Sequence, residues 1–137
     1  MKRVLIAEDD MIGRRMIKRF MEQYAACELA VDGLEALNLF AESLQQGTMY
    51  DLVCLDIMMP QLDGLKVLRA IRDMEIQKGI PEDKRAKIIM TTALNDRKTV
   101  MEAYALGCVG YAWKPIDLDK FESVLREIGF LDTAPAE

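Results

Sequence analysis

The stretch VLIAEDD, residues 4 to 10, places four apolar or small residues directly before three carboxylates. A short apolar run of this kind indicates a buried strand. Residues from about 11 to 24 then carry apolar side chains at helical spacing, so the chain begins with a strand and a helix. An ordinary strand-to-helix turn does not need three acids in a row. The sequence therefore raises the question of what this negative charge binds.

The same alternation of strand and helix continues along the chain. It predicts further strands at 27–31, 52–55, 88–90 and 109–113, and further helices around 37–44 and up to about 46, around 67–71, at 95–106 and at about 117–128. Apolar strands that alternate with helices predict parallel strands, right-handed crossovers and helices on both faces of one sheet. The predicted fold is therefore a doubly wound α/β fold, with a five-stranded parallel sheet flanked by five helices.

Size and composition fit one folded domain. The chain has 137 residues, of which 51% are hydrophobic and 30% charged, which is typical of a globular protein and too apolar for a disordered one. We expect a domain over residues 1–129 and a short C-terminal tail over residues 130–137. A net charge of -5 disfavours direct binding to nucleic acid, which needs a basic patch.

Two further observations limit location and chemistry. No stretch is apolar for long enough to cross a bilayer, and the first residues do not form a secretory signal, so we expect no membrane contact and a cytoplasmic location. Three widely spaced cysteines indicate packing thiols rather than a disulfide or zinc framework. The chain has no histidine, which excludes a Ser-His-Asp triad and histidine-containing metal sites within it.

Polar side chains gather where the predicted strands end. Strand one ends in Glu8, Asp9 and Asp10, strand three in Asp56, strand four in Thr91 and Thr92, and strand five in Lys114. Ligands of such sheets bind beyond the carboxyl ends of the strands. Clustered carboxylates repel one another unless a cation neutralises them. Because all the available ligands are hard oxygens, Mg²⁺ fits better than zinc or copper.

Four ordered motifs carry a resemblance to a known family. They are the acidic pair Glu8-Asp9, LDIMMPQLDG around Asp56, TTA at 91–93 and YAWKP at 111–115. On these motifs the chain resembles the receiver domain of two-component response regulators, the CheY-like family, over residues 2 to about 129. The resemblance implies the flavodoxin-like strand order 2-1-3-4-5 and a single-domain signalling protein.

The resemblance also implies roles for individual residues at the metal site. Asp56 would be the phosphoacceptor. Glu8 and Asp9 would hold Mg²⁺ together with Asp56, one of them through water, and the Met58 backbone carbonyl would be another ligand. Asp10 lies outside the usual acidic pair of the family.

Further residues would complete the switch. By the same resemblance, Thr92 and Lys114 would contact the phosphoryl oxygens, Tyr111 would be the aromatic switch residue, and the Lys114-Pro115 bond would be cis. Tyr111 and Trp113 are two residues apart on one strand, so we expect them on the same face.

The expected function is a phosphorylation-dependent switch rather than an enzyme with substrate turnover, although phosphotransfer and autodephosphorylation would be self-catalysed. Because the chain has no histidine, a histidine kinase or a histidine phosphotransfer protein must donate the phosphoryl group in trans. The signal would pass to an unidentified downstream protein through the helix at 95–106, strand five and the last helix.

Competing hypotheses fit the sequence less well. A haloacid-dehalogenase-type phosphatase would need a second acid two residues after the nucleophile, where this chain has Met58. A flavodoxin-like binding module would need a phosphate-binding glycine loop, and none is seen. A pseudo-receiver scaffold would not need the complete set of site residues. The basic residues 14, 15, 18 and 19 form either a solvated helix face or a docking patch.

Overall fold

The computed structural model describes residues 2–93 and 96–132. Its strands are β1 (Lys2–Ala7), β2 (Ala25–Ala30), β3 (Leu52–Asp56), β4 (Lys87–Thr92) and β5 (Gly110–Trp113). Its helices are α1 (Met11–Met21), α2 (Gly33–Gln46), α3 (Gly64–Gln77), α4 (Arg97–Leu106) and α5 (Leu118–Glu127), and a short 3₁₀ turn (Glu82–Lys84) precedes β4.

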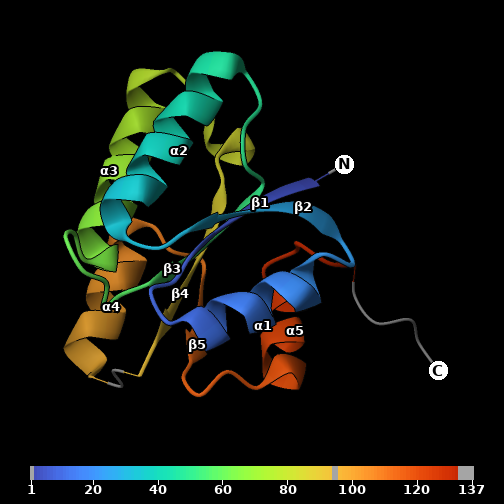
Figure 1. Cartoon of the computed structure of the whole chain (residues 1–137). Helices are drawn as coiled ribbons and strands as arrows, with labels where there is room; N and C mark the ends of the chain where they lie inside the picture. Colours follow the sequence, from blue (N-terminus) through green and yellow to red (C-terminus); the bar gives the residue numbers. More distant parts are fainter. Residues whose placement is uncertain (1, 94–95, 133–137) are drawn as a thin grey trace.

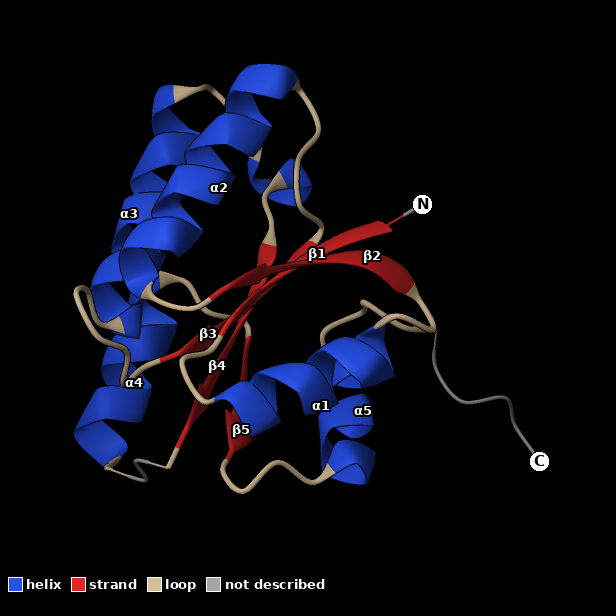
Figure 2. Ribbon diagram, in the orientation of Figure 1, coloured by secondary structure: helices blue, strands red, loops and turns tan. Residues whose placement is uncertain are grey.

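The strands form one parallel sheet in the order β2-β1-β3-β4-β5. The chain therefore crosses over between successive strands, and the order reverses beside β1. Figures 1 and 2 show the sheet running through the molecule, with α2, α3 and α4 on one side and α1 and α5 on the other. The predicted doubly wound fold and its strand order are confirmed.

Each face of the sheet has its own apolar core. Phe40 of α2 and Leu68 of α3 pack over one face, with alternate side chains of the strands. Ile17 of α1 and Phe121 of α5 pack over the other face. Since helices cover both faces, the central strand β3 is buried along its whole length. The sheet thus gives the strand ends a rigid support.

The first helix and the second strand have different bounds from those predicted. The apolar stripe predicted a helix to about residue 24, but α1 ends at Met21 and β2 begins at Ala25. The cause is the pairing with β1, in which Lys2 lies opposite Ala25 and Ala7 opposite Ala30. Pairing with β1 thus extends β2 back to Ala25, and residues 22–24 form the turn between α1 and β2.

The fourth helix begins at Arg97, where the Asp96 side chain accepts a hydrogen bond from the Lys98 N–H at 3.1 Å. The start of the predicted 95–106 helix falls partly on Asn95, which lies outside the described residues. The C-terminal end of α4 is as predicted, because Gly107 caps it with a φ of 111°. A left-handed residue of this kind commonly ends a helix.

Phe130 belongs to the packed domain rather than to a tail. Its side chain is 2% exposed and lies in the core beneath α1 and α5. Its carbonyl oxygen accepts a hydrogen bond from Lys2 Nζ at 2.6 Å, and its N–H donates to the Leu125 carbonyl oxygen at 2.9 Å. The expected tail over residues 130–137 is therefore wrong at Phe130. Residues 133–137 lie outside the described part of the chain, and a domain boundary near residue 129 stays a prediction.

Among the described residues, no helix has the length and apolar character that a bilayer crossing requires.

Candidate functional site

The sheet brings three of the predicted site residues together although they are far apart in the sequence. Glu8 follows β1, Asp56 ends β3 and Lys114 follows β5, so all three lie at the carboxyl edge of the sheet. The Lys114 ammonium donates to Asp56 Oδ2 at 2.9 Å and to Glu8 Oε2 at 2.9 Å. It also lies 2.8 Å from Glu8 Oε1. One cation thus bridges two buried carboxylates.

An acidic cluster lies beside this bridge. Glu8, Asp9 and Asp56 each offer a carboxylate oxygen, and these oxygens all lie within 4.8 Å of one another. Glu8 and Asp56 are 1% and 2% exposed, whereas Asp9 is exposed. Glu8 Oε1 is buried, and among the described residues its close polar neighbour is the Lys114 ammonium, which lies 2.8 Å away but not in hydrogen-bond geometry. Three carboxylates that each offer an oxygen to one point fit a hard divalent cation such as Mg²⁺.

The third acid of the opening stretch has a structural role. Asp10 Oδ2 accepts a hydrogen bond from the Gly13 N–H at 3.0 Å, which makes Asp10 the N-cap of α1. The Asp10 N–H in turn donates to Glu8 Oε2 at 3.1 Å. Asp10 therefore begins the helix and orients Glu8, while Glu8 and Asp9 remain for a cation.

Burial and the positive charge of Lys114 shift the pKa of the acceptor carboxyl, Asp56, in opposite directions. Burial, and then a hydrogen bond with Glu8, raise the pKa of Asp56, while Lys114 lowers it, and together these effects raise it to about 7. For Lys114 burial alone would lower the pKa, but hydrogen bonds to Glu8 and Asp56 outweigh burial and raise it. The lysine therefore stays charged, and Asp56 ionises near neutral pH when no metal is bound.

We expect Asp56→Asn to become more stable relative to the wild type as the pH rises in Mg²⁺-free buffer. The folded-state pKa of about 7 lies above the unfolded value of about 4. Asp56 thus stabilises the fold fully below pH ~4 and loses this contribution as the pH rises through ~7. Asparagine does not titrate, so its advantage should grow by about 1–3 kcal/mol between pH 5 and pH 8. Chemical denaturation at both pH values measures this, and a constant difference would contradict it.

Helix α3 packs directly against the backbone of Asp56. Asp63 caps this helix, with Oδ1 accepting from the Lys66 N–H at 3.0 Å, and the Gly64 N–H donates to the Ile57 carbonyl oxygen at 2.8 Å. A Cβ atom on Gly64 would lie 2.3 Å from the Asp56 carbonyl oxygen. Residue 64 must therefore be glycine for this close approach. The LDG at the end of the Asp56 motif thus supports the acceptor.

The predicted switch residues lie on the α4 side of the sheet. Thr92 is fully buried and pairs with Trp113 in the strand register, and its carbonyl oxygen accepts from the Lys114 N–H at 2.8 Å. The Tyr111 ring is 8% exposed and lies 4.9 Å from the Trp113 ring between centroids. Tyr111 and Trp113 thus share one face, as predicted, and the predicted cis Lys114-Pro115 bond is also confirmed.

Two contacts near these residues did not follow from the sequence. The ring of Tyr104 on α4 stacks against Tyr111, with 6.4 Å between centroids and 26° between planes. Arg14 of α1, which the sequence placed on a basic helix face, donates to the backbone carbonyl oxygens of Glu8 and Asp9. No local pattern marks either contact, because each depends on how a helix is placed against a strand end.

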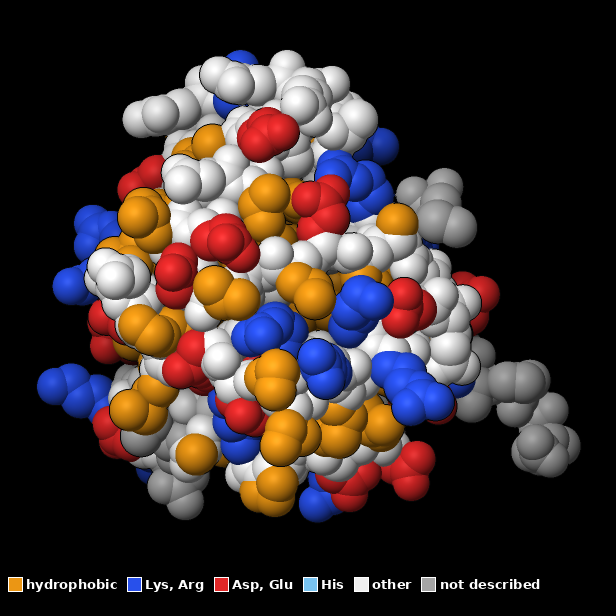
Figure 3. Space-filling model, viewed as in Figure 1, with side chains coloured by type: hydrophobic (Ala, Val, Ile, Leu, Met, Phe, Trp, Pro, Cys, Tyr) orange, Lys and Arg blue, Asp and Glu red, His pale blue; other side chains and the backbone are white. Residues whose placement is uncertain are grey.

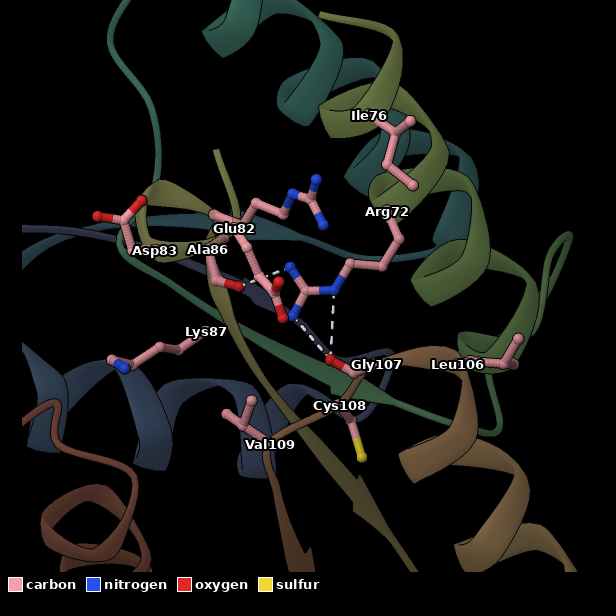
Figure 4. Close-up of a pocket in the computed structure, with 11 residues that line it drawn as sticks. Arg72, Ile76, Glu82, Asp83, Ala86, Lys87, Leu106, Gly107, Cys108 and Val109 are labelled. Atoms are coloured by element: carbon pink, nitrogen blue, oxygen red, sulfur yellow. Dashed lines mark hydrogen bonds between the residues drawn. The ribbon is translucent and has the colours of Figure 1, made fainter. Parts of the chain in front are cut away.

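A separate hollow of about 510 Å³ lies between α3, the start of β4 and the end of α4. Figure 4 shows Arg72 reaching across it to the backbone of Ala86 and Gly107. Arg72 also donates to the buried Glu75 carboxylate at 2.7 Å. The Arg72 guanidinium already has these three partners. The residues around this hollow therefore form a structural joint between α3, β4 and α4, which does not belong to the acidic site.

Comparison with known proteins agrees with this geometry. Residues 4–126 match the family model described as the response regulator receiver domain. The chain is 32% identical over 130 residues to the chemotaxis protein CheY of Treponema pallidum, covering 90% of this chain and 83% of that protein. Several other relatives are much longer, and the chain spans as little as 6% of one of them.

Solved structures show the same architecture. The receiver domain of Saccharomyces cerevisiae Ssk1, in a co-crystal with the histidine phosphotransfer protein Ypd1, matches with a TM-score of 0.80 and 28% identity, covering 97% of this chain and 92% of the other. The receiver domain of the Arabidopsis thaliana histidine kinase CKI1, complexed with Mg²⁺ and BeF₃⁻, matches with a TM-score of 0.79 and 27% identity, covering 95% and 91%. The chain therefore belongs to the response regulator receiver domain family of two-component systems and is a phosphorylation-dependent signalling switch.

Proposed function

We propose that Asp56 accepts a phosphoryl group from a phosphohistidine of a partner protein, in a site where Mg²⁺ is held by Glu8, Asp9, Asp56 and the Met58 backbone carbonyl. The observation that carries this proposal is the double ion pair of Lys114 with Asp56 and Glu8. A lysine that already lies 2.9 Å from the acceptor oxygen is placed to contact the oxygens of a phosphoryl group on Asp56.

The proposed transfer conserves atoms and charge. A carboxylate oxygen of Asp56 forms a bond to phosphorus while the phosphorus–nitrogen bond of the phosphohistidine breaks, and the imidazole leaves with its electron pair. Lys114 contributes a fixed positive charge against the negative charge that spreads over the phosphoryl oxygens. When bound, Mg²⁺ would supply further positive charge there. The same arrangement would admit water for a self-catalysed autodephosphorylation, so the chain needs no separate catalytic domain.

We further propose that Thr92 and Tyr111 transmit the change. An acyl phosphate adds acceptor oxygens at the end of β3, next to the strand that carries Thr92. A movement of Thr92 towards them would leave room into which Tyr111 can rotate. Tyr111 is held between Tyr104 and Trp113, so its rotation would alter both exposed rings. The proposed output surface is therefore α4, β5 and α5, and the downstream partner binds there.

The donor is proposed to dock on the rim of the acidic site. Exposed apolar side chains surround this edge of the sheet, namely Met11, Ile12, Val31, Leu34 and Met58. Figure 3 shows orange apolar side chains beside the Lys and Arg side chains of the same face, where α1 lies. A histidine phosphotransfer protein occupies a co-crystal with a related receiver domain. We infer that a histidine kinase or such a phosphotransfer protein is the donor.

We expect Ile12→Glu to slow transfer from a phosphohistidine protein at least tenfold without slowing labelling by acetyl phosphate. Ile12 is 74% exposed on the first turn of α1. A carboxylate there would lose apolar contact area with a docked protein, whereas a small donor needs no such contact. Transfer rates from a purified phosphohistidine protein and from acetyl phosphate measure the two routes. Equal slowing of both would place the defect in the site itself.

The direct test of the function is to incubate the protein with acetyl phosphate and Mg²⁺ and to map any acyl phosphate by mass spectrometry. We expect one phosphoryl group, on Asp56, and none when Mg²⁺ is removed by a chelator.

The location of the protein is inferred from its cysteines. The three cysteines are all unpaired thiols, and unpaired thiols are usual in the cytoplasm. We therefore propose a cytoplasmic location. The net charge of -5 supports the further proposal that the chain makes no direct contact with nucleic acid.

A further inference from the structure

Arg14 differs from the other basic residues of α1 in where its side chain goes. Its Nη1 atom donates to the Glu8 carbonyl oxygen at 2.8 Å and to the Asp9 carbonyl oxygen at 3.3 Å. Its side chain is half-buried, whereas the next residue, Arg15, is exposed. Arg14 thus connects the first turn of α1 to the backbone of the two acids that follow β1.

This contact supplies a support that the sheet does not give. The last paired residue of β1 is Ala7, so the carbonyl oxygens of Glu8 and Asp9 lie beyond the ladder of hydrogen bonds. The Glu8 N–H is held by the Ala30 carbonyl oxygen at 3.1 Å, and the Glu8 carboxylate by Lys114. Asp9 is exposed, so packing does little to fix it. The Arg14 guanidinium bonds the backbone of both acids and limits the positions that the Asp9 carboxylate can take.

The residue before Arg14 keeps this turn of the helix close to the acids. A Cβ atom on Gly13 would lie 3.1 Å from Asp10 Oδ2 and 3.6 Å from Glu8 Oε1. The approach to Asp10 Oδ2 would be tight, whereas the distance to Glu8 Oε1 is an ordinary contact, so glycine here mainly keeps the Asp10 cap of the first turn undisturbed. The turn that brings Arg14 to the Glu8 and Asp9 carbonyls therefore also lies close to the Glu8 carboxylate.

We propose that Arg14 is a positioning residue for the metal site, which holds the Glu8-Asp9 backbone so that the Asp9 carboxylate stays beside those of Glu8 and Asp56. The inference rests on the proposed binding of Mg²⁺ at this cluster. Two physical effects of Arg14 on a cation have opposite signs. Its positive charge repels the metal, while its hydrogen bonds preorganise the ligands. The proposal is that preorganisation is the larger effect.

The test compares Arg14→Met with Arg15→Met, which remove the same charge from neighbouring positions. The dissociation constant for Mg²⁺ is measured from the rise of the unfolding midpoint over a series of Mg²⁺ concentrations. We expect Arg14→Met to bind Mg²⁺ about tenfold more weakly. Arg15→Met should bind Mg²⁺ as tightly as the wild type or more tightly, because only a repelling charge is lost. Arg14→Lys keeps a donor and the charge, and should recover part of the affinity.

Each outcome either supports or contradicts the inference on Arg14. If Arg14→Met binds Mg²⁺ as tightly as the wild type, or more tightly, the charge effect dominates and the inference is wrong. An equal loss of Mg²⁺ affinity in Arg15→Met would also contradict the inference. If Arg14→Met does not fold, the affinity of Arg14→Lys decides, since unchanged binding there would mean that the geometry of the guanidinium is not needed. Absence of any Mg²⁺ effect on the wild type would instead reject the proposed metal site itself.

Discussion

Asp56→Asn should show no phosphoryl labelling by acetyl phosphate and Mg²⁺ while keeping a native fold. The amide of asparagine has no anionic oxygen to attack phosphorus, and it is a poorer ligand for a hard cation than a carboxylate. Its shape is nearly that of aspartate, so the buried contacts at the end of β3 persist. Mass spectrometry of the intact protein measures the labelling, and circular dichroism checks the fold. Labelling at the wild-type level would reject Asp56 as the acceptor.

A matched control lies one residue before the same strand. Asp51 is an exposed aspartate just before β3, at the opposite edge of the sheet, where its Oδ2 accepts from the Arg3 N–H at 2.8 Å. Asp51→Asn makes the same chemical change far from the acidic cluster. We expect it to be labelled at the wild-type rate. A loss of labelling in this control would mean that the Asp56 result reflects a general effect of removing an acid from β3 or its flank.

Gly64→Ala should destabilise the protein by about 3 kcal/mol or more. Alanine normally favours a helix over glycine by ~1 kcal/mol, so helix propensity alone predicts the opposite sign. The added Cβ would lie 2.3 Å from the Asp56 carbonyl oxygen and 2.8 Å from the Ile57 Cα, and both are backbone atoms that cannot rotate away. Either α3 or the end of β3 must shift. Urea denaturation measures the free energy of unfolding.

Gly47→Ala is the comparison for this variant. Gly47 caps α2 with a φ of 74°, and an added Cβ would meet no atom within 4 Å. The substitution there should cost only about 1 kcal/mol, from the left-handed backbone. If Gly64→Ala were no more destabilising than Gly47→Ala, the contact between α3 and the acceptor strand would be looser than the structure shows. Slower labelling of folded Gly64→Ala would show that this contact also positions Asp56.

The features that the sequence predicted are those set by local pattern and by topology. Strands buried on both faces are apolar along their whole length, as in β3, and parallel strands place all their carboxyl ends at one edge. These two rules predict that Glu8, Asp56 and Lys114 lie together. The family resemblance then implied the cis bond at Pro115, which the structure contains.

The features that escaped prediction depend on contacts between distant parts of the chain. The start of β2 at Ala25 is fixed by pairing with β1, against a helical pattern in its own neighbourhood. Phe130 is buried because the core beneath α1 and α5 accommodates its ring and Lys2 bonds its carbonyl, 128 residues away in sequence. Tyr104 stacks on Tyr111 because of the angle at which α4 crosses β5, and no spacing rule gives that angle.

The joint around Arg72 has a mechanical consequence for α4. Arg72 donates two hydrogen bonds to the carbonyl oxygen of Gly107, so this end of the helix is tied to α3 (Figure 4). A rod that is held at one end pivots about that end. Over the length of α4, a pivot of ~10° would carry residue 97 by ~2.6 Å but residue 104 by less than ~1 Å. The surface met by a protein that docks at the start of α4 would therefore be displaced several times further than the surface near Gly107.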